Sequence, residues 1–209
     1  MGIIKAEGWG RMFVEKPPTP YDGEPWGFDN GAYGWWVRGE QFNEIIYRKR
    51  LDKAFSVGVP YMAVIPDMVA RGDESLDYSL GWLDKLPHGW QWYLAVQDGM
   101  DKDRVIRVID KVDGIFLGGT NAYKATAYEW CRTAHKHGKK FHYGRAGTAR
   151  KIQDALMIGA DSADSAFPLW TMDRLRETIK YVNGEEVQRT LFAMEEMFEN
   201  SQSKLKYME

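Results

Sequence analysis

Short apolar segments alternate with segments of helical spacing along most of this chain. Residues 60–67 read Pro-Tyr-Met-Ala-Val-Ile-Pro-Asp, a nearly continuous apolar run of the kind found in strands buried on both faces. Further strands are predicted over residues 90–98, 114–120, 140–145 and 159–165. Helices are predicted between them over residues 73–86, 101–112, 121–137 and 148–158. This alternation indicates an α/β fold with a parallel sheet and outer helices.

The two ends of the chain extend this pattern. The N-terminal part is predicted to hold a strand over 2–6, a Pro- and Gly-rich loop over 16–27, an extended piece with a turn over 26–33, and a helix over 39–57. Two C-terminal helices are predicted over 171–182 and 185–200. With about seven strands and no dinucleotide glycine fingerprint, a (β/α)8-type TIM barrel is favoured over an open doubly wound sheet. One small domain over residues 1–209 is expected, in which residues 11–14 supply the eighth strand or the barrel is irregular or incomplete.

Composition narrows the classes of site and location. The chain has a single cysteine, Cys131, which excludes an internal disulfide and any multi-cysteine zinc site. His135 and His137 are two positions apart and do not share a helix face, so neither metal nor cofactor is predicted. No long apolar run is present, so we expect no signal peptide, no membrane partner and a cytoplasmic protein, in the host cytoplasm if the gene is carried by a phage.

Positive charge is concentrated in one region, although the formal net charge is −2. Residues 124–151 hold eight Lys and Arg residues against one acidic residue, Glu129. Such a stripe is the footprint expected for phosphate or nucleic-acid binding, although a solvated helix surface is the alternative. The residues predicted to contact the polyanion are Lys139, Lys140, Arg145, Arg150 and Lys151. A second cluster, Arg48 to Arg50 with Lys53, is interpreted as helix surface.

Polar residues and glycines follow one predicted strand after another. They are Asp29-Asn30, Asp67, Gln97-Asp98, Gly118-Gly119, Gly144-Arg145 and Asp164. In a barrel the carboxyl ends of all strands converge on one mouth, where active sites are built. Each residue also has a structural explanation, such as an N-cap, an Asx turn or a tight bend. Their occurrence at consecutive strand ends favours a functional site.

The segment Gly-Ala-Asp-Ser-Ala-Asp-Ser at 159–165 carries two carboxylates. Alternation along a strand puts Asp161 and Asp164 on opposite sides, and the strand-end rule favours Asp164. Carboxylates across a pocket suit glycosidic chemistry, with one as nucleophile and one handling protons. A further carboxylate and a glutamine amide suit the hydrogen-bonding edge of a purine. Nearby aromatic residues, Phe28 and Tyr33 among them, are candidates for stacking on a base.

Six short segments together resemble the tRNA-guanine transglycosylase superfamily, and most closely its compact phage-type members, which exchange guanine in DNA for a 7-deazaguanine. They are FDNGAY (28–33), VIPD (64–67), LAVQDG (94–99), FLGGT (116–120), HYGRAGTARKI (142–152) and GADSADS (159–165). The segments lie in the family's order. FDNGAY replaces a form of the motif that contains serine and glycine, and the cysteine-rich zinc site of the tRNA enzymes is absent.

The resemblance implies a role for each matched residue. Asp164 corresponds to the nucleophile that attacks the sugar C1′ and forms a covalent glycosyl-enzyme intermediate, and Asp29 to the general acid/base. Asp67 corresponds to the aspartate that reads the purine edge. Gln97, Gly118 and Gly119 correspond to its companions in base recognition, and Asp161 to a supporting acidic position.

We therefore expect a guanine transglycosylase, a pentosyltransferase acting on DNA with a free 7-deazaguanine, such as a queuosine precursor, as second substrate. The alternatives are an N-glycosidic-bond hydrolase, a tRNA-guanine transglycosylase, a non-catalytic nucleic-acid-binding barrel and a sugar-phosphate barrel enzyme. The two C-terminal helices, with Met194, Met197 and Phe198, are predicted either to form a homodimer face or to close the barrel.

Overall fold

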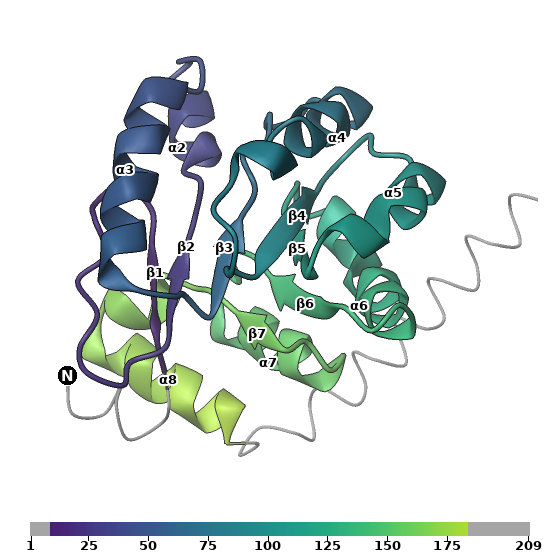
Figure 1. Cartoon of the computed structure of the whole chain (residues 1–209). Helices are drawn as coiled ribbons and strands as arrows, with labels where there is room; N and C mark the ends of the chain where they lie inside the picture. The colour runs from purple at the N-terminus through teal and green to yellow at the C-terminus, as the bar shows by residue number, and fades with distance from the viewer. Residues whose placement is uncertain (1–8, 184–209) are drawn as a thin grey trace, which may run out of the picture. The chain divides into compact units, whose positions relative to one another are not determined.

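The computed structural model describes residues 9–183 of the chain (Figure 1). The chain divides into two compact units, residues 1–144 and residues 145–209, and each is described by itself. The predicted strand over 2–6 lies outside the described residues. So does the predicted helix over 185–200, with its proposed dimer face.

A parallel sheet forms the centre of the first unit. Within residues 9–144 its strands are β1 (Arg11–Phe13), β2 (Trp26–Phe28), β3 (Met62–Val64), β4 (Trp92–Val96), β5 (Gly114–Leu117) and β6 (Lys140–Tyr143). Each strand pairs in parallel with the next along the chain, for example Ala95 with Phe116 and Phe116 with His142. This order has no reversal, unlike the order of a doubly wound sheet. The predicted α/β class with a parallel sheet is confirmed, and β1 falls on the residues named as an additional strand.

The described part of the first unit holds five α-helices: α2 was not predicted, and the other four are shorter than their predicted ranges. They are α2 (Ala32–Val37), α3 (Glu44–Val57), α4 (Asp73–Leu80), α5 (Lys102–Val108) and α6 (Ala127–Lys136). Helix α3 starts at Glu44 rather than near residue 39, because the Asn43 side chain accepts a hydrogen bond from the backbone N–H of Ile46 and caps it. The pattern over 121–137 divides into the 3₁₀ turn η3 (Tyr123–Thr126) and α6, which packs on β5 and β6 (Figure 1). Gly138 follows α6 with φ of 68°, as the predicted helix stop requires.

The two faces of the sheet have different layers. Met62, Val64, Tyr93 and Ala95 form a buried cluster on one face, and Met12 and Phe116 pack against it. Alternation along each strand turns the intervening residues to the helix-covered face, where Phe28 contacts Tyr47 of α3. Because both faces are covered, the strands read as continuous apolar runs.

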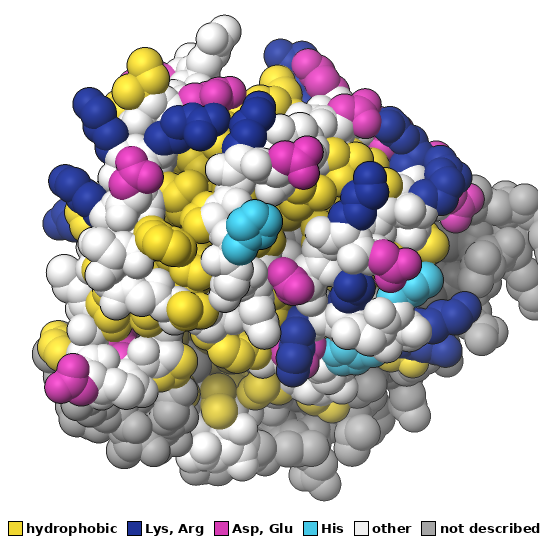
Figure 2. Space-filling model, in the orientation of Figure 1, with side chains coloured by type: hydrophobic (Ala, Val, Ile, Leu, Met, Phe, Trp, Pro, Cys, Tyr) yellow, Lys and Arg dark blue, Asp and Glu magenta, His cyan; other side chains and the backbone are white. Residues whose placement is uncertain are grey.

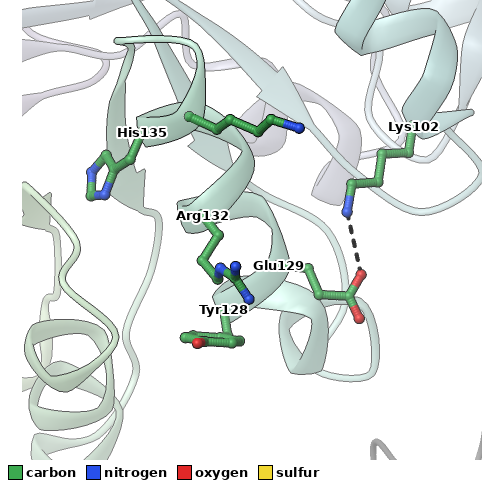
Figure 3. A pocket seen from close by; sticks show the side chains of 6 residues that line it. Lys102, Tyr128, Glu129, Arg132 and His135 are labelled. Atoms are coloured by element: carbon green, nitrogen blue, oxygen red, sulfur yellow. Dashed lines mark hydrogen bonds and ion pairs between the residues drawn. The ribbon is translucent and has the colours of Figure 1, made fainter.

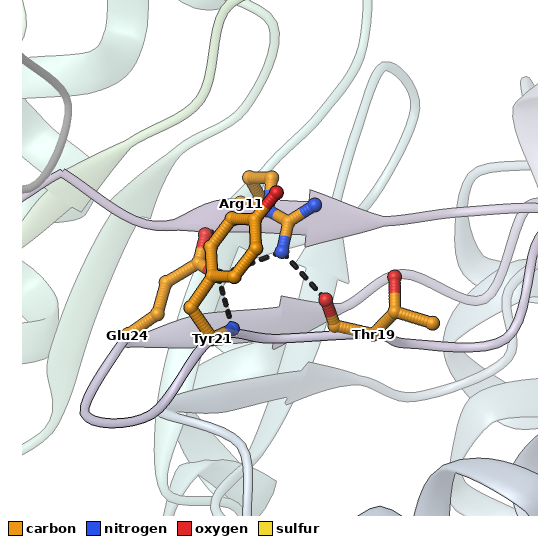
Figure 4. A network of polar contacts seen from close by, with 4 residues as sticks. All are labelled: Arg11, Thr19, Tyr21 and Glu24. Carbon is orange, nitrogen blue, oxygen red and sulfur yellow. Dashed lines mark hydrogen bonds and ion pairs between the residues drawn. The ribbon is translucent and has the colours of Figure 1, made fainter. Parts of the chain in front are cut away.

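A polar network holds β1 to the Pro-rich loop that follows it (Figure 4). The Arg11 guanidinium donates from Nε and Nη2 to the two carboxylate oxygens of Glu24, both at 2.7 Å, and from Nη2 to the Thr19 carbonyl at 2.6 Å. The Tyr21 ring lies 4.6 Å from this guanidinium. The bidentate geometry is the strong form of an ion pair, so the loop is fixed over the edge strand.

The second unit, described over residues 145–183, is mainly helical. It holds α7 (Ala149–Met157), the two-residue strand β7 (Ser162–Ala163), the 3₁₀ turn η4 (Phe167–Leu169) and α8 (Met172–Val182). The Thr148 and Thr171 hydroxyls cap α7 and α8 by accepting from backbone N–H groups, as in ordinary N-caps. The two helices pack together, and Gln153 Nε2 donates to the Tyr181 carbonyl at 3.3 Å. Among the residues that the structure describes, no helix is long and apolar enough to cross a membrane.

Candidate functional site

The carboxyl ends of β2, β3 and β4 meet in a buried polar group that we call the strand-end cluster: Asn30, Asp67, Ser75 and Gln97. Asn30 Nδ2 donates to Asp67 Oδ1 at 2.8 Å, and Gln97 Nε2 donates to Asp67 Oδ2 at 3.0 Å. Only 8% of Asp67 and 3% of Gln97 is exposed. The structure thus brings together the two residues that the sequence assigned to the edge of a purine, although they are 30 positions apart.

Gln97 is the centre of this cluster. Its Oε1 accepts from the backbone N–H of Ala70 at 2.6 Å. Its Nε2 donates to Ser75 Oγ at 2.9 Å and to the Met68 carbonyl at 3.1 Å, besides Asp67. Since Oε1 is occupied by a backbone donor, the amide nitrogen must face the carboxylate. Gln97 therefore fixes both the loop after β3 and the orientation of Asp67.

The Asp67 carboxyl lies in surroundings that oppose its charge. Burial raises the pKa of this group to about 6, and the nearby Asp29 carboxylate adds to the rise, while the hydrogen bonds from Asn30 and Gln97 act against it. Asp67 is buried and is oriented by hydrogen bonds from two side chains, so its carboxylate is suited to accept hydrogen bonds from N–H groups of a ligand. Because its pKa differs between the folded and unfolded states, the stability of the protein depends on pH.

We expect the free energy of unfolding to decrease as the pH rises from 4 to 7, because the buried Asp67 carboxyl loses its proton over this range. The folded state holds the Asp67 proton up to a pKa of about 6, whereas an unfolded chain releases it near pH 4. The free energy of unfolding of the wild type should therefore decrease by on the order of 2–3 kcal/mol over this pH range. The Asp67→Asn protein, which has no carboxyl at this position, should not show this decrease. Urea unfolding at several pH values would measure the difference between the two proteins, with the exposed Asp84→Asn as control. A difference that stays constant with pH would refute this assignment.

Asp29 lies beside the cluster and is anchored through its backbone. Its side-chain Oδ1 accepts from the Gly31 N–H at 2.8 Å, which is the Asx turn considered from the sequence. Arg50 of α3 donates from Nη2 to the Asp29 carbonyl at 3.0 Å and from Nη1 to the Asn30 carbonyl at 3.2 Å. The interpretation of Arg50 as helix surface is wrong, because only 8% of this residue is exposed. Its helical register with the buried residues Tyr47, Leu51 and Ala54 is the signal that identifies it.

The glycine pair after β5 forms a tight bend. Gly119 has φ of 74°, and a Cβ there would lie 2.6 Å from Asp98 Oδ2. Asp98 accepts from the Thr120 N–H and from the Thr120 hydroxyl, both at 2.7 Å. Asp98 thus holds the Gly118–Gly119 backbone in place, a positioning role that the sequence pattern does not specify.

The two aromatic candidates occupy different environments. Phe28 is fully buried, with its ring 6.0 Å from that of Tyr47 and 5.7 Å from that of Trp90. It therefore presents no ring surface to a ligand in this structure. Tyr33 of α2 is 44% exposed, and its ring lies 5.7 Å from that of Trp36, which is 50% exposed. This exposed pair follows Asp29 and Asn30 directly in the chain.

In the second unit, Asp164 follows β7 directly and is partly exposed. Its Oδ1 accepts from the backbone N–H of Arg145 at 2.9 Å, and its carbonyl accepts from the Ala146 N–H at 2.8 Å. Arg145 has φ of 49°, a left-handed conformation that is uncommon outside glycine. A backbone donor thus orients the carboxylate predicted to be the nucleophile, while Asp161 is likewise partly exposed before β7.

The predicted phosphate-binding residues are divided between the two units. Arg145 and Arg150 are exposed and Lys151 is partly exposed in the second unit. Lys139 and Lys140 stand at the amino end of β6 in the first unit, whereas Asp67 and Gln97 follow the carboxyl ends of their strands. In a parallel sheet the amino ends and the carboxyl ends of the strands lie on opposite sides, so Lys139 and Lys140 are separated from the strand-end cluster.

Further cations of the stripe lie on the outer side of α6. Figure 2 shows Lys, Arg and His side chains interspersed with Asp and Glu on the side where α5 and α6 lie. An open pocket of about 510 Å³ is found there, lined by Lys102, Tyr128, Glu129, Arg132, His135 and Lys136 (Figure 3). Lys102 Nζ pairs with Glu129 at 3.4 Å, and the Arg132 guanidinium lies 5.7 Å from the Tyr128 ring. These contacts are those of an exposed, mutually paired helix surface.

Comparisons with known proteins identify no family for this chain. No family model and no curated protein matches the chain. Among solved structures, the chain is similar to one described as a dihydrodipicolinate synthase family protein from Coccidioides immitis, with 12% sequence identity and a TM-score of 0.47. The match covers 80% of this chain and 53% of that protein, so the chain spans about half of its length.

Proposed function

We propose that this protein is a guanine transglycosylase, a pentosyltransferase that exchanges guanine in DNA for a free 7-deazaguanine. In this proposal residues 1–209 form one small (β/α)8-type barrel domain, and the carboxyl ends of the strands make its site. The motif resemblance supplies the reaction and the role of each residue.

The hydrogen bond between Gln97 and Asp67 is the observation that supports this function most strongly. The resemblance assigns both residues to recognition of the base, and the structure joins them in one buried group. Guanine presents an N–H and an NH₂ side by side, and a carboxylate accepts from both. Asp67 has lone pairs left for this purpose, since each oxygen receives one of the side-chain hydrogen bonds described above.

The chemistry proceeds as two displacements at the sugar C1′. A carboxylate oxygen of Asp164 attacks C1′, the bond from C1′ to guanine N9 breaks, and guanine leaves with a proton supplied by Asp29. The incoming 7-deazaguanine then loses its N9 proton to Asp29 and attacks C1′, which releases the Asp164 carboxylate. Two bonds are made and two are broken, and the proton returns to Asp29.

DNA is the favoured polymer because the chain lacks the cysteine-rich zinc site of the tRNA enzymes. A guanine in a duplex has to leave the stack before its C1′ is accessible. The exposed ring of Tyr33 is suited to stack on such a base, and the exposed Arg145 and Arg150 with the partly exposed Lys151 to contact the phosphates.

A product assay tests this function. Duplex and single-stranded DNA carrying labelled guanine are incubated with the protein and a 7-deazaguanine, and tRNA is run in parallel. We expect release of labelled guanine, incorporation of an equal amount of the new base, and no apurinic sites. Apurinic sites without incorporation would instead identify a hydrolase, and DNA binding with no release would identify a non-catalytic barrel.

A further inference from the structure

The loop between β3 and α4, residues 68–72, covers the side chain of Gln97. Gln97 is buried, whereas Ala70 and Arg71 of the loop are exposed. The Ala70 N–H and the Met68 carbonyl both contact the Gln97 amide, at 2.6 Å and 3.1 Å. In this conformation the loop therefore lies between the solvent and a residue that the proposed function assigns to the base.

The Gln97 amide nitrogen already uses both of its hydrogens. Three acceptors lie around Nε2: Ser75 Oγ at 2.9 Å, Asp67 Oδ2 at 3.0 Å and the Met68 carbonyl at 3.1 Å. Ser75 and Asp67 are buried members of the strand-end cluster, so the Met68 carbonyl is the acceptor that can leave with the loop. Guanine carries its O6 beside the N–H that Asp67 would accept. To accept from Gln97, that O6 has to take the place of the Met68 carbonyl.

The loop is fixed at both ends and strained in its middle. Before it, the Pro66 carbonyl accepts from the Ser79 hydroxyl at 2.9 Å. At its other end Gly72 packs so closely that a Cβ there would lie 2.4 Å from the Gly99 carbonyl oxygen. Between these points Ala70 has φ of 60°, a left-handed conformation that is unfavourable for a residue with a side chain. The closed loop therefore holds backbone strain that opening would relieve.

Ser75 of α4 opposes this opening. Its hydroxyl oxygen accepts from the Met68 N–H at 3.0 Å, besides the hydrogen bond from Gln97. Ser75 is fully buried, so the Met68 N–H has this partner only while the loop is closed. The closed conformation thus depends on a balance between the Ser75 hydrogen bond and the strain at Ala70.

We propose that residues 68–71 form a latch over the base-recognition site and that this latch opens to admit a purine. In the closed state the Met68 carbonyl holds the Gln97 hydrogen that an oxygen of the base accepts in the open state. The inference rests on the proposed function for the identity of the ligand, whereas the opening is a property of the loop itself. The apparent affinity for a free base then depends on the fraction of the protein whose latch is open.

Two substitutions should shift the latch in opposite directions. Ser75→Ala removes the acceptor of the Met68 N–H and should lower the hydrogen-exchange protection of the Ala70 amide about fivefold. Ala70→Gly relieves the left-handed backbone and should raise the protection of the amide at residue 70 about fivefold. Amide exchange followed by NMR on the full chain measures both effects. Arg71→Met, which changes an exposed side chain of the same loop, is the control and should leave the protection unchanged.

Equilibrium dialysis with labelled guanine tests whether the latch controls the site. The Kd for guanine should fall about fivefold in Ser75→Ala and rise about fivefold in Ala70→Gly, by the same factors as the protection. A Kd that stays constant while the protection changes would overturn the proposal, as would protection that neither substitution changes. A Ser75→Ala protein that binds no guanine would overturn it as well. Guanine binding that follows the latch, with no base exchange in DNA, would refute the transglycosylase reaction and leave the latch in place.

Discussion

Replacing Asp164 with asparagine is expected to reduce guanine exchange by on the order of 10⁴-fold or more. An amide oxygen does not form the ester bond to C1′ that the exchange requires. The substitution preserves size, and its Oδ1 still accepts from the Arg145 N–H, so the fold should be retained. The rate of labelled guanine release from DNA measures the loss, and thermal unfolding checks the fold.

Asp161 is the matched control, because it lies in the same segment and is also partly exposed. Asp161→Asn should keep far more activity than Asp164→Asn, since alternation places the two side chains on opposite sides of the strand. The reverse result, with loss at Asp161 and wild-type exchange at Asp164, would transfer the nucleophile to Asp161 and contradict the proposed site.

Replacing Arg50 with methionine is expected to lower the free energy of unfolding by about 2–4 kcal/mol. Arg50 is buried, and its guanidinium donates to the carbonyls of Asp29 and Asn30. Methionine has a similar length but no donor, so two carbonyls lose a charged partner. The loss also frees the turn that carries Asp29 and the Asn30 amide bound to Asp67.

Urea unfolding at neutral pH measures this effect. Lys53→Met is the control on the same helix, because Lys53 is exposed, and it should change stability by less than about 0.5 kcal/mol. Equal stability of the Arg50→Met protein and the wild type would show that Arg50 does not anchor the turn. If the Arg50→Met protein is less stable at pH 7 but exchanges base at the wild-type rate, Arg50 stabilises the turn without contributing to the proposed reaction.

The strands are the part of the fold that sequence predicts best. Residues 62–64 and 92–96 are apolar at successive positions because the sheet is covered on both faces, and the structure places β3 and β4 there. Helix lengths are harder to predict because caps decide them. The Asn43 side chain sets the start of α3, several residues after the apolar spacing begins.

The candidate site is predicted in part. The strand-end rule brings Asp67 and Gln97 together correctly, since it depends only on the order of parallel strands. It says nothing of side chains that reach the strand ends from helices, so Arg50 and Lys124 were assigned to surfaces although both are buried. A count of charges along the chain also ignores which end of a strand a residue occupies. Lys139 and Lys140 stand at the amino end of β6, whereas the strand-end cluster of the same unit follows the carboxyl ends of its strands.

Trapping of the glycosyl-enzyme intermediate is the most direct test of the proposed reaction. The protein is incubated with guanine-containing DNA without a second base, denatured rapidly, digested with nuclease and protease, and analysed by mass spectrometry. We predict a sugar-bearing peptide modified at Asp164 in the wild type and no modified peptide from Asp164→Asn. Base exchange by the wild type with no adduct on Asp164, or with the adduct on another residue, would contradict the proposal.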